Sequence, residues 1–344
     1  MRAFIGRIAF RLPGLRAALA LLAVTALTAA GAEGLLAAGP GIPIPAVSGR
    51  IDHFAQDVAG KRLFVAALGN GTVEVIDLAS GTVVHTIDHL DEPQGVAWLP
   101  DLGRLVIAEG GGDAVDVLDG TTWARLGRIE HLGDADNIRV EAKTGLVYVG
   151  VGSGRSAALA LIDAKSATLM RTLPLPGHPE AFALETAGPR IYVNVPDDGS
   201  VVVLDRSTGA TAARWELAGA SSNFPMALDE AAHRLFVACR SPARLVILDT
   251  ATGSQISSLP CASDADDVFR DAAAQRVYVI GGGGEVTVIG ASDPLHYDVL
   301  AAIPTVSGAR TGFFDAAAGR LYVACPRHIF GKSAEIRTFA APHP

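Results

Sequence analysis

A strand-like motif of four residues occurs seven times along this chain at nearly constant spacing. The first copy is Leu63-Phe64-Val65-Ala66, and successive copies begin 42, 42, 44, 44, 42 and 44 residues apart. The seven copies occupy residues 63–66, 105–108, 147–150, 191–194, 235–238, 277–280 and 321–324. A period near 43 residues built from β-branched and aromatic runs is typical of a β-propeller with one blade per repeat. The sequence therefore predicts an all-β fold, a seven-bladed β-propeller with four-stranded antiparallel blades, formed as one domain by residues 43–340.

Aspartates recur at fixed places inside the repeats, and these places predict turns. The third strand of five repeats is expected to end at Asp77, Asp119, Asp163, Asp205 and Asp249. A further acid, such as Asp57, stands six residues before the second strand in every repeat but the second, where Leu99 stands. Aspartate favours such positions because its side chain hydrogen-bonds the turn backbone. We therefore interpret these repeated acids as turn residues and not as catalytic groups.

The segment before the first repeat predicts how the ring closes. Residues 44–49 read Ile-Pro-Ala-Val-Ser-Gly and resemble residues 303–308, Ile-Pro-Thr-Val-Ser-Gly, which end the sixth repeat. By analogy, residues 44–47 are predicted to form the outer strand of the seventh blade. Pairing of the two chain ends would remove the exposed sheet edges. Residues 33–42 are then expected to be a linker and residues 341–344 a C-terminal tail.

The first 32 residues have the order of a secretory signal peptide. Four arginines precede an apolar run at residues 17–30, and Ala30-Gly31-Ala32 offers a small-residue cleavage site. An uncleaved anchor is the alternative, but a run of 14 residues is short against the roughly 20 that a membrane span needs. We expect cleavage after Ala32, a periplasmic or secreted location, and no membrane insertion of the mature chain.

Charge and cysteine content exclude several classes of partner and cofactor. The chain has 28 basic and 36 acidic residues, and loss of the four leader arginines leaves a net charge of −12. Such a surface gains nothing from phosphate counterion release, so no nucleic acid partner is expected. Only Cys239, Cys261 and Cys325 are present, without the Cys-x-x-Cys-His motif of covalent haem attachment. Cys239 and Cys261 are close enough in topology to form a disulfide.

The second-strand motif also carries a family resemblance. Ile191-Tyr192-Val193-Asn194 and the copy at residues 321–324 resemble the YVTN-repeat β-propeller family. The resemblance covers residues 43–340 and implies an exported seven-bladed propeller. It implies no single activity, because members of this fold superfamily include binding proteins, haem- and quinone-linked enzyme domains and lyases.

Polar residues at equivalent positions of different repeats predict a site at one mouth of the central channel. His53, Asn137 and Asp267 lie ten residues before their second strands. The position eleven residues before the second strand carries Asp52, Gln94, Asp136, Glu180, Asp266 and Arg310. Each belongs to a loop that enters an innermost strand, where the circle of equivalent positions is smallest. These side chains should therefore converge, on the face opposite Asp57.

Candidate roles follow from the chemistry of these side chains. Asn137, Glu180 and Asp267 form an oxygen set suited to a divalent cation such as Ca²⁺ or Mg²⁺. His53 or His178 could act as a general base, and Arg310 could hold an anionic group. The predicted ligand-binding residues are Asp52, Gln94, Asp136, Asn223 and Asp266. The alternatives are hydrogen bonds to the backbone of the next blade, a satisfied loop histidine, and an Arg–Asp pair across the channel.

Two function classes remain open from the sequence. The first is an exported binding protein that holds a small polar or anionic ligand, or a partner segment, at the channel mouth. The second is a metal-dependent hydrolase, lactonase or lyase acting on a lactone-like or sugar-acid substrate, because gluconolactonase-type propellers place a similar oxygen set at the channel mouth. The sequence favours binding, since this fold hosts many functions and no specific catalytic motif is present.

Overall fold

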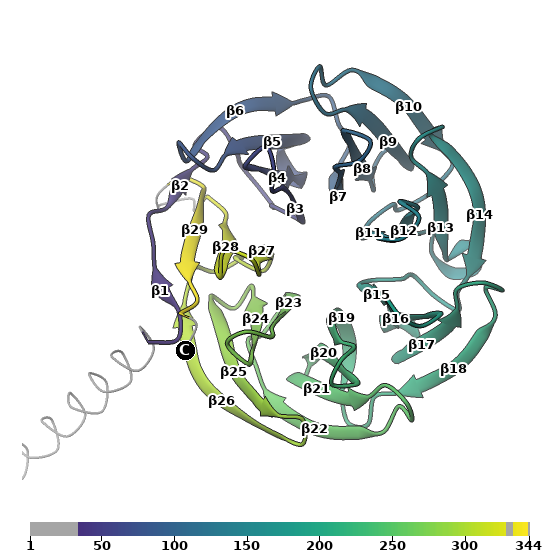
Figure 1. Cartoon of the computed structure of the whole chain (residues 1–344), viewed down its shortest axis with the longest axis vertical. Helices are drawn as coiled ribbons and strands as arrows, with labels where there is room; N and C mark the ends of the chain where they lie inside the picture. The colour runs from purple at the N-terminus through teal and green to yellow at the C-terminus, as the bar shows by residue number, and fades with distance from the viewer. Residues whose placement is uncertain (1–33, 328–332, 343–344) are drawn as a thin grey trace, which may run out of the picture.

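The computed structural model describes residues 34–327 and 333–342, and these residues form seven β-sheets arranged in a ring. Six sheets are blades of four antiparallel strands, with the first strand innermost and the last outermost (Figure 1). The seventh sheet contains the last three strands of the chain, and two short N-terminal strands form its outer edge. The predicted all-β, seven-bladed fold class is confirmed. The predicted signal peptide lies outside the described residues.

The first four blades follow one another directly along the chain. Their strands are β3 (Phe54–Asp57), β4 (Arg62–Ala67), β5 (Thr72–Asp77) and β6 (Thr82–Ile87); β7 (Pro93–Leu99), β8 (Arg104–Glu109), β9 (Ala114–Asp119) and β10 (Arg125–Glu130); β11 (Ile138–Val140), β12 (Val147–Val151), β13 (Ala158–Asp163) and β14 (Thr168–Pro174); and β15 (Phe182–Leu184), β16 (Arg190–Val195), β17 (Ser200–Asp205) and β18 (Thr211–Glu216). Three short 3₁₀ turns, η1 (Leu68–Asn70), η2 (Gly154–Ser156) and η3 (Pro196–Asp198), join second and third strands.

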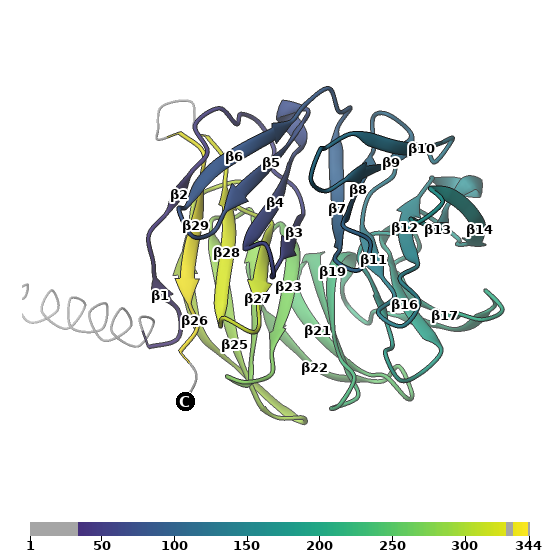
Figure 2. The same cartoon turned by 45° about the horizontal axis from the view of Figure 1, so that its top comes forward.

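The last three blades complete the ring. Their strands are β19 (Ser221–Asp229), β20 (Arg234–Ser241), β21 (Ala243–Asp249) and β22 (Gln255–Pro260); β23 (Ala265–Asp271), β24 (Arg276–Gly281), β25 (Glu285–Asp293) and β26 (His296–Pro304); and β27 (Gly312–Asp315), β28 (Arg320–Cys325) and β29 (Glu335–Ala340), which pairs with β1 (Ala37–Ala38) and β2 (Ile42–Pro43). In the tilted view of Figure 2 the inner strands β3, β7 and β27 run from one face of the ring toward the other.

The second strands are continuous apolar runs because both of their faces are buried. Alternate side chains of a strand point to opposite faces. Leu63 and Val65 of β4 therefore pack toward Tyr322 of blade 7, whereas Phe64 packs toward Leu105 of blade 2. The same arrangement recurs around the ring, so the hydrophobic core consists of seven layers between neighbouring blades.

The repeated aspartates are turn residues, as predicted. The Asp205 carboxylate accepts hydrogen bonds from the hydroxyls and backbone N–H groups of Ser207 and Thr208, and these bonds lower its pKa to about 2. Equivalent hydrogen bonds end the third strands at Asp77 and Asp119.

The ring closes through the N-terminal segment, but by residues earlier than predicted. Strands β1 and β2 pair with β29, with Ala37 opposite Ala340 and Ile42 opposite Ile336. Residues 44–47, the predicted outer strand, form a turn in which the Val47 N–H donates to the Ile44 carbonyl. Residues 33–42 therefore are not a linker, because they include β1 and part of β2.

Arginines at the start of the second strands donate hydrogen bonds to backbone carbonyls of neighbouring blades. These contacts were not predicted from the sequence. Arg62 donates to the Gly120 carbonyl of blade 2 over 2.8 Å and pairs with Asp57 at 2.7 Å. Its guanidinium also lies over the rings of Trp98 and Trp123, at 4.9 and 5.4 Å. The same hydrogen bond to a backbone carbonyl is made by Arg104, Arg190, Arg234 and Arg276. The acceptor of Arg276 is the Leu35 carbonyl, next to β1.

An Arg62→Met variant is expected to lose about 2–3 kcal/mol of unfolding free energy. The change leaves the buried Asp57 carboxylate without its ionic partner, which typically costs more than a surface ion pair contributes. Chemical denaturation with circular dichroism measures the loss. Arg320→Met is the matched control, because Arg320 occupies the same position of blade 7 but is exposed and forms no ion pair within the described residues. Equal losses of unfolding free energy in both variants would contradict this stabilising role of Arg62.

Candidate functional site

The loops between blades meet at one mouth of the channel and enclose a small polar cavity. The cavity has a volume of about 150 Å³. It is lined by Arg50, Gln94, Asp134, Asp136, His178, Glu180, Phe224, Arg240, Asp266 and Arg310. Six of these residues were predicted from the sequence: Gln94, Asp136, His178, Glu180, Asp266 and Arg310. We call this space the mouth cavity.

Repeat symmetry explains which loop residues reach the mouth cavity. Phe224 lies eleven residues before the second strand of blade 5 and so completes the predicted circle of equivalent positions. Arg50, Asp134 and His178 lie thirteen residues before theirs, two positions from the circle, where an extended chain presents the same side. Counting back two more residues could have found Arg50 and Asp134, which the sequence analysis missed, whereas His178 was already a candidate. Arg240 had no such signal, because it comes from the end of β20 and not from a loop between blades.

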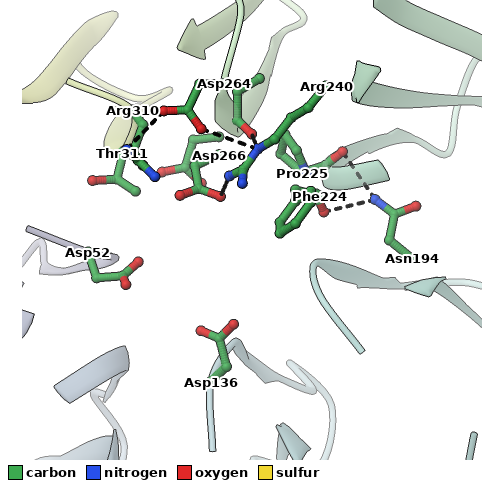
Figure 3. Close-up of polar contacts among 12 residues, drawn as sticks. Asp52, Asp136, Asn194, Phe224, Pro225, Arg240, Asp264, Asp266, Arg310 and Thr311 are labelled. Atoms are coloured by element: carbon green, nitrogen blue, oxygen red, sulfur yellow. Dashed lines mark hydrogen bonds and ion pairs between the residues drawn. The ribbon is translucent and has the colours of Figure 1, made fainter. Parts of the chain in front are cut away.

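One side of the mouth is a network of arginines and aspartates from blades 5 to 7. Arg240 Nη2 lies 2.5 Å from Asp266 Oδ1, and Arg240 Nε lies 3.6 Å from Asp264 Oδ1 (Figure 3). The Arg240 guanidinium also stacks 3.6 Å above the centre of the Phe224 ring. Arg240 is therefore fixed by two carboxylates and an aromatic face.

The other two arginines of the mouth cavity are also paired with carboxylates. Arg310 Nη2 lies 2.9 Å from Asp264 Oδ2, and Arg50 Nη2 lies 2.8 Å from Asp52 Oδ2. Asp266 is 3.7 Å from Arg50 as well. Arg310 thus forms the Arg–Asp pair considered as an alternative from the sequence, through Nη2, while its Nε atom has no hydrogen-bond partner among the described residues. Its predicted anion-holding role stays a prediction.

The opposite side of the mouth carries two carboxylates without an arginine partner. Asp136 is 6% exposed, and its Oδ1 atom has no hydrogen-bond partner. Burial and the Glu180 carboxylate raise the pKa of Asp136 to about 7, against the lowering effect of His53. Burial and the Asp266 carboxylate likewise raise the pKa of Glu180 to about 7. Carboxyl groups behave in this way where the cost of burying their charge exceeds the compensation from nearby basic groups.

His53 lies deeper, where the mouth cavity leads into a central channel of about 500 Å³. Its Nδ1 atom is 3.6 Å from Asp267 Oδ1, and its Nε2 atom is 3.6 Å from Asp52 Oδ1. Burial alone would lower the pKa of His53, but Asp52 and Asp267 outweigh it and raise the pKa to about 10. The ring is therefore an imidazolium at neutral pH and has no lone pair to accept a proton. The predicted role of His53 as a general base does not fit this state.

The predicted metal ligands Asn137, Glu180 and Asp267 do not surround one space. Glu180 lines the mouth cavity, Asp267 lines the channel, and Asn137 is buried and lines neither. Asp267 Oδ2 instead accepts a hydrogen bond from the Gly312 N–H of the next blade, over 2.8 Å. This bond is of the kind considered from the sequence as the structural alternative, a hydrogen bond to the backbone of the next blade.

Asn223 does not reach the mouth cavity. Its side chain is fully buried and donates to Asn194 Oδ1 at 3.0 Å and to the Ser200 carbonyl at 2.9 Å. Asn194 in turn donates to the carbonyls of Phe224 and Pro225 (Figure 3). Asn223 therefore joins blades 4 and 5, which is the structural alternative considered from the sequence, and it does not line the cavity where it was expected.

A different set of groups could hold a cation. Asp136, His178 and Glu180 each place one potential ligand atom within 4.8 Å of the other two. His178 is thereby grouped with two carboxylates and not with the residues of the channel.

The three cysteines are free thiols in the structure, and the Cys239–Cys261 disulfide that the topology would allow is not formed. Burial raises the pKa of both thiols to about 12 and that of Cys325 to about 11. They are therefore protonated at neutral pH and contribute no reactive thiolate to the mouth.

Comparison with known proteins shows the fold and no more. No family model and no curated protein matches the sequence. A chain of hydrazine synthase from Kuenenia stuttgartiensis is similar in structure, with a TM-score of 0.72 and 17% identity over 79% of this chain and 91% of that one. The WD40 repeats of RRP9 are similar with a TM-score of 0.74 and 12% identity, over 88% of this chain and 97% of that one. Among the described residues, no helix has the length and apolar character needed to cross a membrane.

Proposed function

We propose that this protein is a binding protein that holds a small cation, or the cationic group of a small ligand or partner segment, at the channel mouth. The observation that carries the proposal is the asymmetry of the mouth cavity. Its three arginines are already paired with aspartates, whereas Asp136 and Glu180 face the cavity without an arginine partner. A cation at this side would compensate two buried carboxylates. The proposal therefore reverses the ligand charge expected from the sequence.

The sequence of residues 1–32 and the YVTN-like motifs support a location outside the cytoplasm, in the periplasm or in the secreted fraction. Membership of the YVTN-repeat family is part of the same proposal. Intact-mass analysis of exported protein should show a chain that begins at Glu33. Retention of Met1 would contradict this part of the proposal.

Binding fits the mouth better than the hydrolase, lactonase or lyase that the sequence left open. Such an enzyme needs a group that can take a proton from water or substrate. His53 is held as an imidazolium by Asp52 and Asp267. His178 donates from Nδ1 to the Gly152 carbonyl over 2.7 Å, and its other nitrogen would be occupied by a cation held together with Asp136 and Glu180. A binding function requires only the cavity and its carboxylates.

The test is a thermal-shift series on protein stripped with a chelator. Mg²⁺, Ca²⁺, Mn²⁺, Zn²⁺ and putrescine are the cationic probes, and phosphate and citrate are the anionic ones. At least one cation is expected to raise Tm, since a ligand at 100 times its Kd adds about 2.7 kcal/mol to stability. Asp136→Asn should remove the shift. Asp101→Asn should keep it, because Asp101 is exposed on a turn between β7 and β8, on the opposite face. A shift with anions alone would overturn the proposal.

A further inference from the structure

The geometry points to a site for one divalent transition-metal ion, of the Zn²⁺ or Mn²⁺ class, with Asp136, His178 and Glu180 as protein ligands. The inference rests on the proposed function, because it identifies the cation that the mouth cavity would hold. It differs from the Ca²⁺ or Mg²⁺ site expected from the sequence both in its ligands and in the class of metal.

The three ligands come from two neighbouring loops that the fold brings together. Asp136 lies between β10 and β11, and His178 and Glu180 lie between β14 and β15. Their ligand atoms fall within 4.8 Å of one another. Ligands bound to one such ion at about 2.1 Å would lie somewhat closer to one another than this. The Glu180 side chain is only half-buried and forms no ion pair among the described residues, so it is free to make that adjustment.

His178 is oriented as metal-binding histidines are. Its Nδ1 atom lies 2.7 Å from the Gly152 carbonyl oxygen and 3.4 Å from Asp134 Oδ2. A carbonyl oxygen can only accept, so Nδ1 carries the proton and Nε2 keeps its lone pair. A carboxylate or carbonyl that receives the N–H of a ligating histidine fixes the tautomer and raises the basicity of the other nitrogen. Asp134 is therefore a positioning residue for this site.

The burial and hydrogen bonding of Asp136 indicate, independently of the ligand spacing, that a cation binds at this site. Its carboxylate is 6% exposed, lines the mouth cavity, and leaves Oδ1 without a hydrogen-bond partner. In Figure 3 this carboxylate points into the open centre of the mouth, across from the arginine network. An unpaired buried oxygen is costly unless a ligand satisfies it. A cation held between Asp136 and Glu180 would do so.

The imidazole decides the class of metal. Ca²⁺ and Mg²⁺ take oxygen ligands almost exclusively, whereas Zn²⁺, Mn²⁺ and related ions accept a mixed set of imidazole and carboxylates. Three protein ligands leave at least one position open to water or to a ligand. His53 carries a charge of the same sign as the metal ion, and its Nε2 is 3.9 Å from Asp136 Oδ1. Its charge is already paired with Asp52 and Asp267 on the channel side, which reduces the repulsion.

The experiment is equilibrium dialysis of chelator-stripped full-length mature protein against Zn²⁺, Mn²⁺, Mg²⁺ or Ca²⁺ separately, with metal analysis of the retained protein. We expect one Zn²⁺ or Mn²⁺ per chain and an affinity for Mg²⁺ and Ca²⁺ lower by at least 100-fold. His178→Asn should weaken Zn²⁺ or Mn²⁺ binding by about 100-fold, since asparagine can still donate to the Gly152 carbonyl but lacks Nε2. Asp134→Asn should weaken it by about 10-fold.

Two controls separate this inference from the proposed function. His89→Ala removes a histidine that is exposed and lies outside the mouth cavity, and it should leave metal affinity unchanged. Co²⁺-loaded protein should show d–d absorption that His178→Asn shifts, a readout that loss of stability alone would not give. If His178→Asn binds Zn²⁺ as wild type does, the metal site is wrong. If only putrescine or Mg²⁺ binds, and Asp136→Asn abolishes that binding, the metal site is wrong but the proposed function stands.

Discussion

A chain that begins at Ile44, without β1 and β2, is expected to lose about 5 kcal/mol or more of unfolding free energy relative to one that begins at Glu33. The removed segment pairs with β29 and buries Leu36 and Ile42, which are 3% and 6% exposed. Loss of each such side chain alone typically costs 2–5 kcal/mol. The truncation also leaves β29 as an open sheet edge, which invites association with other chains. Chemical denaturation and light scattering measure both effects.

Two point variants of the same segment provide the matched control. Leu36→Asp places a charge in the layer between blades 6 and 7 and should destabilise the ring by more than 3 kcal/mol. Ala38→Asp adds the same charge to an exposed position of β1 and should change stability by less than about 0.5 kcal/mol. Equal midpoints for the truncated and complete chains would show that the closing strands contribute nothing.

There are physical reasons why the sequence predicted the propeller fold correctly but placed the ring-closing strand at the wrong residues. Both faces of each second strand are buried, so the strands read as short apolar runs whose period survives sequence divergence. The closing segment gives no such signal. It consists of two strands of two residues each, separated by Gly39-Pro40-Gly41. Glycine and proline in this density are typical of a linker, and only pairing with β29 makes the segment a strand.

The sequence predicted the position of the site better than its chemistry. Counting back from the second strands located half of the residues of the mouth cavity, because equivalent positions of a propeller form a circle. Charge compensation depends on pairs formed across blades, which this counting does not reveal. Arg310 is paired with Asp264, and Asp266 is paired with Arg240, a residue from the end of a second strand. The sign of the preferred ligand could therefore be seen only in three dimensions.

The double variant Asp136→Asn, Glu180→Gln is expected to bind cations at least 100-fold more weakly and yet to unfold at a higher temperature than metal-free wild type. Burial raises the pKa of both carboxyls to about 7, so at pH 8 the folded wild-type protein must hold two buried charges that the unfolded chain holds in water. Removal of these charges should add about 1–2 kcal/mol at pH 8, or about 1.5–3 °C in Tm for a chain of this length. Functional sites commonly lower stability in this way.

The pH dependence of stability shows whether the double variant gains stability because it lacks the two buried charges or because it is better packed. A carboxyl whose pKa is higher in the folded than in the unfolded state binds more protons when folded, so stability falls as pH rises from about 4 toward 7. The charged groups that act on Asp136 and Glu180 are His53, His178, Asp52, Asp266 and Arg240. His53, with its pKa raised to about 10, also stabilises most below pH 6.5 and loses this effect toward pH 10, in both proteins. With chelator present, the difference in Tm between the two proteins should therefore be near zero at pH 4 and increase to its full value by pH 8. A difference that is the same at both pH values would show that the carboxylates of the mouth are not under electrostatic strain, and the argument for a cation between them would lose its basis.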